Sequence, residues 1–183
     1  MNKKANHITK SAANRGLSLE RAINLSNQYY LAKKRAIVHK KPTPIQVVKV
    51  DYPKRQAAKI VEAYYKTPST TDYNGIYQGK YIDFEAKETR SKTSFAFKNI
   101  HQHQIEHLAG IIELKGTAFF IISFIIIEET YLIAAQHIID RLNEGQKSIS
   151  YEAIKREGYL IKESYLLPLD YLSALDHILS QEE

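Results

Sequence analysis

Two carboxylates and a lysine stand at two-residue spacing in the segment 81–87, which reads Tyr-Ile-Asp-Phe-Glu-Ala-Lys. Side chains alternate between the two faces of a β-strand, so Asp83, Glu85 and Lys87 would share one face. The opposite face would consist of Ile82, Phe84 and Ala86. Charged side chains are seldom gathered on one face of a central strand without a chemical reason, because burying them unpaired is costly. The segment therefore indicates a functional site.

Phosphodiester hydrolysis is the chemistry that these side chains fit. A hard divalent cation such as Mg²⁺ prefers oxygen ligands and is usually held by one or two carboxylates. Asp72, from a preceding loop, and Glu85 could supply them, and the cation would polarise a phosphate and acidify a bound water. Lys87 could stabilise the developing charge or orient the water. An isolated Glu-x-Lys is more often an ion pair on a solvent face, but the upstream Asp72 and the apolar alternate face favour a site.

Positive charge is concentrated in the first third of the chain. Residues 1–66 hold fifteen lysines and arginines against three acidic residues, whereas residues 67–183 hold eleven basic and seventeen acidic residues. Such an asymmetry favours a polyanionic partner for the N-terminal third. A basic solvated face is the alternative that charge alone leaves open.

The elements that must position these residues follow from hydrophobic periodicity. Helical spacing of apolar residues predicts helices over residues 17–34, 99–114, 135–143, 151–157 and 169–179. β-Branched and aromatic runs predict strands over residues 45–50, 76–77, 80–87, 117–127 and 131–135, with turns at 78–79 and 128–130. Residues 60–66 fit either a second strand beyond a basic turn at 51–55 or a short helix. The order of elements predicts an α/β fold with a small mixed sheet flanked by helices.

Composition narrows the class of protein. Hydrophobic residues make up 44% of the chain and charged residues 25%, as in ordinary globular domains. The sequence has no cysteine, which excludes disulfides and thiolate metal sites and fits a cytoplasmic protein. The longest apolar run, residues 118–127, is about half the roughly 20 residues that a spanning helix needs, so we expect no membrane partner. We expect a flexible basic arm over residues 1–15 and a single nuclease domain over residues 16–183.

Asp72 followed by Glu85-Ala86-Lys87 resembles the PD-(D/E)xK nuclease motif, although no proline directly precedes Asp72. Four longer blocks resemble the RecU family of Holliday junction resolvases and arrive in that family's order. They are residues 39–44 (HKKPTP), 51–55 (DYPKR), 67–75 (TPSTTDYNG) and 82–89 (IDFEAKET). The segment Asn14-Arg15-Gly16 and the helix after it are also similar. The resemblance covers about residues 14–175.

This resemblance implies a restriction-endonuclease-like fold and a homodimeric enzyme that cuts four-way DNA junctions symmetrically during recombination and DNA repair. It implies Mg²⁺ as cofactor, with Mn²⁺ as an alternative, and contacts with a strand-exchange recombinase and branch-migration proteins. The residues that it implies around the metal are Thr70, Asp72, Glu85 and Gln104. Lys87 would stabilise the transition state. Gln104 shares one face of the predicted helix with Leu108 and Ile111 and so faces inward. Without the resemblance, this placement fits a buried glutamine bonded to backbone as well as it fits a site residue.

Residues 40–66 would form the family's stalk, a basic projection that enters the DNA. Pro42, Pro44 and the run at 51–55 fit a projection of this kind. Guanidinium groups suit phosphate, and aromatic rings stack on exposed bases. The DNA-binding residues would be Lys40, Lys41, Lys54, Arg55 and Tyr65. An ordinary charged surface hairpin is the alternative.

Other acidic and histidine residues are less informative. His103 and His107 have the spacing of a zinc site, but the glutamate that a zinc protease needs directly after the first histidine is missing. We therefore expect a DNA-facing or solvated helix edge there. Glu20 could favour a helix dipole or approach the metal, and Asp83 could be a secondary acid or the partner of a lysine. The functional alternatives are a nuclease acting on linear duplex DNA and a non-catalytic junction-binding protein.

Overall fold

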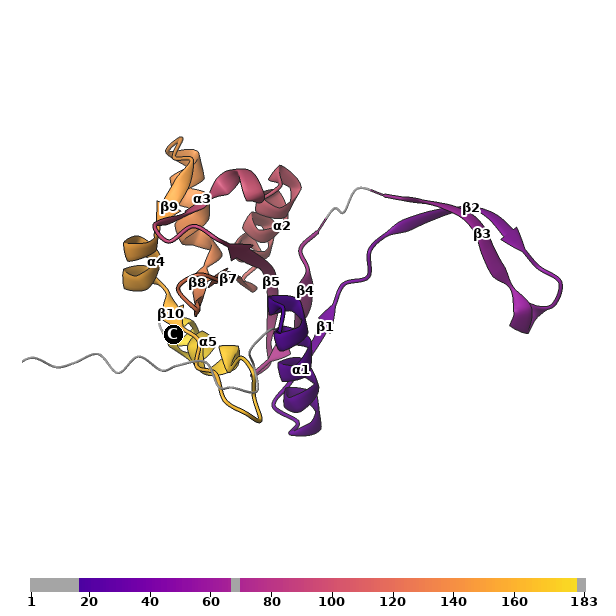
Figure 1. Ribbon diagram of the computed structural model, residues 1–183, viewed down its shortest axis with the longest axis horizontal. Coiled ribbons are helices and arrows are strands. Elements are labelled where there is room, and N and C mark those ends of the chain that lie inside the picture. Colours follow the sequence, from indigo (N-terminus) through magenta and orange to yellow (C-terminus); the bar gives the residue numbers. More distant parts are fainter. Residues whose placement is uncertain (1–16, 67–69, 181–183) are drawn as a thin grey trace, which may run out of the picture.

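The computed structural model describes residues 17–66 and 70–180. These residues form an α/β domain from which a long two-stranded hairpin projects (Figure 1). The arm expected at residues 1–15 lies outside the described residues. Within the described part of the chain, no helix has the length and apolar character needed to cross a membrane.

A mixed sheet forms the centre of the domain, with six strands in the order β1-β4-β5-β7-β8-β10. They are β1 (Ala36–Lys40), β4 (Tyr73–Tyr77), β5 (Lys80–Thr89), β7 (Thr117–Phe124), β8 (Glu129–Ala134) and β10 (Tyr159–Leu160). β5 and β7 run parallel, and every other neighbouring pair is antiparallel. The predicted α/β class with a mixed sheet is therefore confirmed, and the strand with the charged face lies inside the sheet.

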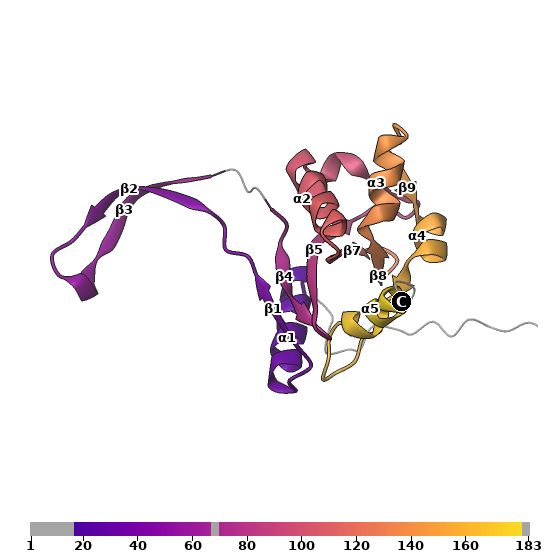
Figure 2. The ribbon, with the colours of Figure 1, turned by 180° about the vertical axis from the view of Figure 1, so that it is seen from behind.

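Helices cover both faces of this sheet (Figures 1 and 2). One face packs against α1 (Leu19–Ala32) and α5 (Tyr171–Leu179). The other face packs against α2 (Gln102–Glu113), α3 (Ala135–Asn143) and α4 (Tyr151–Glu157), together with the short pair β6 (Ser94–Ala96) and β9 (Ser148–Ser150). α2 is the crossover that two neighbouring parallel strands require, so it lies across β5 and β7.

Local capping sets where several helices begin. The Ser18 hydroxyl accepts a hydrogen bond from the Arg21 amide at the start of α1, and Ser150 does the same for Ala153 in α4. The predicted helices at 135–143 and 151–157 have the observed bounds. The helix predicted from residue 99 begins later, at Gln102, because Phe97–Asn99 form a separate 3-10 turn, η3.

β7 is the most buried of the described strands, with all eight residues buried. This confirms that the apolar run is a core strand. The strand is shorter than predicted, however, because residues 125–128 form the turn, in which Glu128 has a φ of 59°. The predicted turn at 128–130 was therefore placed too late, and β8 begins at Glu129. The apolar character of Ile125 and Ile126 concealed the end of the strand.

The hairpin predicted at Gln78 and Gly79 is confirmed. Both residues have positive φ, 50° and 76°, as the tight turn between β4 and β5 requires. β4 also pairs with β1, a strand that the sequence pattern did not predict. A Cβ atom at Gly75 would lie 2.1 Å from the Ile37 carbonyl oxygen, so the close approach of these two strands requires glycine.

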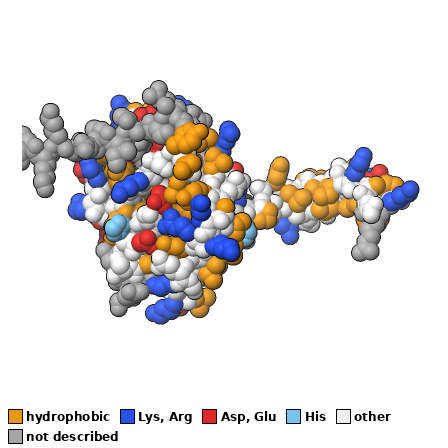
Figure 3. All heavy atoms as spheres, turned by 90° about the horizontal axis from the view of Figure 1, so that it is seen from below, with side chains coloured by type: hydrophobic (Ala, Val, Ile, Leu, Met, Phe, Trp, Pro, Cys, Tyr) orange, Lys and Arg blue, Asp and Glu red, His pale blue; other side chains and the backbone are white. Residues whose placement is uncertain are grey.

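The projecting hairpin, here called the stalk, consists of β2 (Ile45–Asp51) and β3 (Lys59–Tyr65). The short 3-10 turn η2 (Arg55–Ala57) lies at its tip. Every residue of both strands is exposed, and Figure 3 shows apolar and basic side chains along the projection. The strand alternative for residues 60–66 is therefore confirmed, and so is a protruding basic stalk.

Replacing Phe84 by alanine is expected to lower the free energy of unfolding by about 3–5 kcal/mol. Phe84 is fully buried and stacks between Tyr73 and Phe119, with ring centroids 4.9 and 4.6 Å away. Urea denaturation at constant m-value measures the change. Leu114→Ala is the control: this side chain is 83% exposed, and its loss should cost less than about 0.5 kcal/mol. Equal losses in the two variants would contradict the role assigned to the stack.

Candidate active site

The two faces of β5 differ as the sequence pattern predicts. Phe84 lies in the core that contains α1 and α5. Asp83 and Glu85 are 0% and 1% exposed, yet they face α2, where they contact His107 and Gln104 respectively. Buried carboxylates are tolerated only when they are paired or hydrogen-bonded. Two charged groups are therefore held on the inner side of a helix by specific contacts.

Asp72 is joined to β5 by reciprocal hydrogen bonds. Its backbone amide donates to Glu85 Oε2 at 3.0 Å, and its own Oδ2 accepts from the backbone amide of Ala86 at 3.2 Å. The residue stands immediately before β4, which pairs with β5, so the sheet brings the two carboxylates together. The structure thus places Asp72 beside Glu85, as the sequence analysis expected.

The second oxygen of Glu85 accepts two further contacts. Lys87 Nζ lies 2.7 Å from Oε1, and Gln104 Nε2 donates to the same atom at 2.7 Å. The Gln104 carbonyl oxygen is occupied in turn, because it accepts from the His101 amide at 3.0 Å. A backbone N–H needs an acceptor, and this fixes which end of the amide faces Glu85. Gln104 therefore presents its NH₂ group to the carboxylate and orients it.

Electrostatics at Glu85 favour the binding of a cation. Burial raises the pKa of Glu85 to about 7, and the adjacent Asp72 carboxylate adds to the rise, while Lys87 opposes it. A carboxyl group with that pKa is partly protonated near neutral pH. A divalent cation between the two carboxylates would remove their repulsion and displace the proton.

A hollow of about 600 Å³ opens beside these groups at the base of the stalk. Its lining comes from residues 40–44, which lead out to the stalk, and from residues 70–72, which lead back from it. Residues 85–87 of β5, with His101 and Gln104 at the start of α2, complete the lining. Thr70 lies on this lining and is partly exposed. The hollow therefore brings together all four residues that the family resemblance implied around a metal.

The donor set suits a hard cation. In residues 17–66 and 70–180 no group of three or more histidine, cysteine or acidic side chains could hold a metal ion. Two carboxylates remain, with a threonine hydroxyl on the rim of the hollow. Mg²⁺ commonly binds through one or two carboxylates and keeps several waters, so the set fits it.

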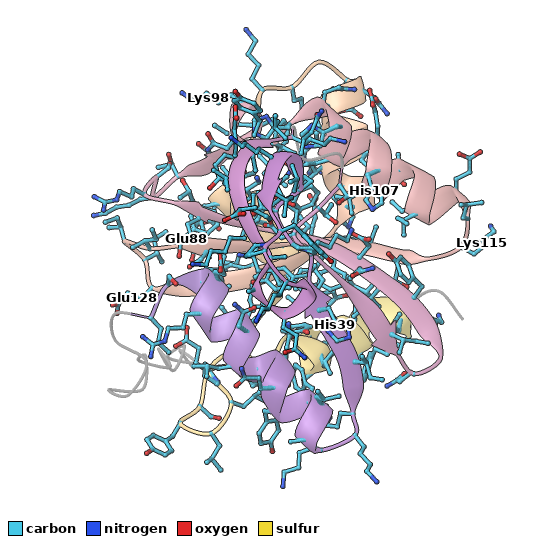
Figure 4. The ribbon with its side chains drawn as sticks, turned by 90° about the vertical axis from the view of Figure 1, so that its right-hand side faces the viewer. His39, Glu88, Lys98, His107, Lys115 and Glu128 are labelled. Atoms are coloured by element: carbon cyan, nitrogen blue, oxygen red, sulfur yellow. The ribbon has the colours of Figure 1, made fainter. Side chains whose placement is uncertain are left out.

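Asp83 has partners that the sequence analysis did not identify. Its carboxylate accepts hydrogen bonds from Lys41 Nζ at 2.8 Å, from Tyr81 Oη at 2.8 Å and from the Thr71 hydroxyl. His107 Nε2 lies 3.1 Å from the same carboxylate. Figure 4, seen from the side of the stalk, shows His107 and Glu88 on opposite sides of the stalk base. Asp83 is thus the partner of a lysine, one of the two roles considered for it.

His107 is half-buried against Asp83, a contact that the expectation of a solvated or DNA-facing edge did not include. A signal was present in the spacing. Asp83 and Glu85 stand two residues apart on a strand, while His107 and Gln104 stand about one turn apart on a helix. Both pairs therefore point from one element toward the other. Thr71 offered no comparable pattern, because its contact depends on how the loop folds.

The residues expected to contact DNA lie in two places. Lys54 precedes the turn at the stalk tip and Arg55 opens it, and Tyr65, at the foot of β3, is 84% exposed. Lys40 ends β1 and forms an exposed ion pair with Glu20 at 2.6 Å. Glu20, which lies in α1, is therefore the partner of this lysine. Lys41 points into the domain, where its ammonium group contacts Asp83.

Comparison with known proteins gives the family. The chain matches the family model of Recombination protein U, RecU, over residues 14–177. Three streptococcal relatives are each named Holliday junction resolvase RecU. The protein of Streptococcus equi subsp. zooepidemicus is 53% identical over 164 residues, which cover 88% of this chain and 81% of the relative. That of Streptococcus agalactiae is 54% identical over 153 residues (82% and 77%), and that of Streptococcus mutans is 53% identical over 162 residues (86% and 82%).

Among solved structures, this chain is similar to Hjc from Archaeoglobus fulgidus, a Holliday junction resolvase. The similar region covers 74% of this chain and 90% of Hjc. The sequence identity is 9% and the TM-score 0.43, a likeness too distant to bear on function. The family match and the streptococcal relatives each extend over most of the chain. On these grounds the chain belongs to the Recombination protein U (RecU) family.

Proposed function

We propose that this protein is a Holliday junction resolvase: a Mg²⁺-dependent endonuclease that makes paired symmetric cuts in four-way DNA junctions during recombination and repair. One observation carries the proposal. Asp72 and Glu85 are held side by side by backbone hydrogen bonds, with Lys87 Nζ 2.7 Å from Glu85, in a hollow at the foot of a basic stalk. The names of the streptococcal relatives support the choice of substrate.

In this proposal Asp72 and Glu85 hold the metal, and Thr70 adds an oxygen from the rim of the hollow. A cation held there would supply a counter-charge for the scissile phosphate and would lower the pKa of a bound water. Mn²⁺ shares this preference for oxygen ligands and would substitute. Gln104 acts through Glu85, since its NH₂ group fixes one carboxylate oxygen and its carbonyl is held by the start of α2.

Lys87 places an ammonium group 2.7 Å from the Glu85 carboxylate. Its side chain is 18% exposed and lies on the same face of β5 as Glu85, so its ammonium group borders the hollow. Negative charge accumulates on the phosphate oxygens as the phosphodiester bond breaks. A fixed ammonium group at this position stabilises that charge or orients the attacking water.

The stalk is proposed to enter the junction. Lys54 and Arg55 at the tip would contact phosphates, and the exposed ring of Tyr65 would stack on a base at the crossover. Lys40 contributes positive charge at the mouth of the hollow. Lys41 borders the same hollow, where its ammonium group is paired with the Asp83 carboxylate.

Symmetric cutting requires two active sites that face two strands of like sequence. A homodimer with a two-fold axis meets that requirement, and we include it in the proposal. A cytoplasmic location and contacts with a strand-exchange recombinase and branch-migration proteins belong to the same proposal, on the strength of the family alone.

The proposal is tested by incubating a labelled four-way junction, or a linear duplex of the same sequence, with the protein in Mg²⁺ or in EDTA. Paired symmetric nicks in the junction, in Mg²⁺ alone, are the expected result. Equal cleavage of the linear duplex would indicate a different nuclease of the same superfamily. Junction binding without nicks in Mg²⁺ or Mn²⁺ would indicate a binding protein whose carboxylates are structural.

Asp72→Ala and Glu85→Ala should each reduce junction cleavage by more than about 100-fold. Even the loss of a residue that only hydrogen-bonds to a metal ligand commonly lowers activity by up to about that factor. Junction affinity measured in EDTA should change little, because the stalk is untouched. Lys87→Ala should slow cleavage more than it weakens binding. The control is Glu106→Ala, an exposed carboxylate on α2. Wild-type cleavage by either carboxylate variant would refute the metal assignment.

Metal binding should weaken as the pH falls through about 7. The raised pKa of Glu85 means that below this value a proton must leave before the carboxylate can bind a cation. The apparent affinity for Mg²⁺ should therefore fall by up to about tenfold per pH unit below 7 and level off above it. Calorimetric titration of the unaltered protein with Mg²⁺ at several pH values measures this. A flat profile in the unaltered protein would contradict the expectation.

A further inference from the structure

Asp83 is the most enclosed charged side chain beside the active site, and the proposed metal chemistry does not use it. It is 0% exposed, and both of its oxygens accept contacts. We call Asp83 and its four partners the stalk clasp. The partners are Lys41, Thr71, Tyr81 and His107.

The members of the stalk clasp come from four parts of the chain. Lys41 begins the arm that leads out to the stalk, and Thr71 belongs to the loop that leads back from it. His107 lies on α2, and Tyr81 lies on β5 with Asp83. Lys41 Nζ also contacts the Thr71 hydroxyl at 2.9 Å and His107 Nε2 at 3.3 Å. One carboxylate therefore joins both arms of the stalk base to the central sheet and to the crossover helix.

The clasp is directly connected to a proposed metal ligand. Asp72 follows Thr71 in the chain, and its carbonyl oxygen accepts from the Lys41 backbone amide at 2.7 Å. On its other side Asp72 is bonded to Glu85 and Ala86. Asp72 is thus held between the clasp and β5. A shift of the Thr71 side chain would move the Asp72 carboxylate relative to Glu85.

Burial of this network is costly, which argues against a passive role. A carboxylate and an ammonium group removed from water lose hydration that their mutual attraction restores only with good geometry. An apolar cluster would join the same elements at lower cost. Charged groups with several directional contacts fix relative positions more narrowly than apolar contacts do, and a metal site needs that accuracy.

We propose that Asp83 is a positioning residue: through Thr71 and Lys41 it fixes the place of Asp72 relative to Glu85 and to the stalk base. The inference rests on the proposed function, because it assigns Asp72 and Glu85 to the metal. It goes beyond that function in making the stalk base and the metal site one mechanical unit.

The sharpest test is a matched pair at Thr71. Thr71→Val keeps the shape of the side chain and removes the hydroxyl that Asp83 accepts from, whereas Thr71→Ser keeps the hydroxyl. We expect Thr71→Val and Asp83→Asn to weaken Mg²⁺ binding by about tenfold or more in calorimetric titration, as loss of outer-shell partners commonly does. Thr71→Ser should bind as the unaltered protein does. Junction affinity in EDTA should stay within about twofold in all three, since the side chains proposed to contact DNA are unaltered.

A second readout does not need the metal. Amide hydrogen exchange reports the hydrogen bond from the Asp72 N–H to Glu85, and it should speed up by about tenfold or more in Thr71→Val and Asp83→Asn but not in Thr71→Ser. Asp170→Asn serves as the control: this carboxylate holds Tyr30 and Ser173 outside the hollow, so its loss should affect melting temperature alone.

Faster exchange at Asp72 together with weaker Mg²⁺ binding in the Thr71→Val and Asp83→Asn variants supports the inference. If these variants exchange faster but the unaltered protein itself binds no Mg²⁺, the positioning role is supported and the proposed function is refuted. Unchanged exchange and unchanged Mg²⁺ binding in Thr71→Val would overturn the inference. So would a parallel decline in melting temperature, metal binding and junction binding, because that is the signature of general destabilisation.

Discussion

The alternation of β5 is the constraint on which the rest of the structure depends. Its apolar side chains occupy the centre of one core, with Phe84 stacked between Tyr73 and Phe119, so the register of the strand is fixed. A slip of one residue would turn Glu85 into that core and Phe84 toward α2. The aromatic stack therefore determines which side chains reach the hollow, although none of its rings lines it.

The opposite face of β5 shows how a small domain keeps acidic side chains away from water. Glu85 and Asp83 each receive contacts from α2, from neighbouring backbone or from lysine, so neither of these two carboxylates is buried without partners. Asp72 and Glu85 nevertheless repel each other where they meet. Burial and, after it, the Asp72 carboxylate raise the pKa of Glu85. A divalent cation bound to both carboxylates, as proposed, would relieve that repulsion.

Periodicity and local signals were enough to predict the α/β class, the hairpin at Gln78-Gly79, the inward face of β5 and the proximity of Asp72 to Glu85. Features set by contacts between distant segments could not be predicted. The pairing of Lys41 with Asp83 depends on how the stalk base crosses the sheet, and nothing in the run 39–44 distinguishes Lys40, which is exposed, from Lys41, which is not. The orientation of the Gln104 amide depends on a backbone N–H whose position follows from where α2 begins.

The stalk has a consequence for the lifetime of the protein in the cell. Its two strands bond to each other and bury none of their residues, so opening them costs far less than unfolding the domain, and opened, exposed segments are where proteases cut. A cut near the tip would leave both severed arms fastened at the base, since Lys41 and Thr71 each bond to Asp83. Proteolysis there would break the hairpin that is proposed to enter the DNA, while the domain stays folded with its carboxylates in place.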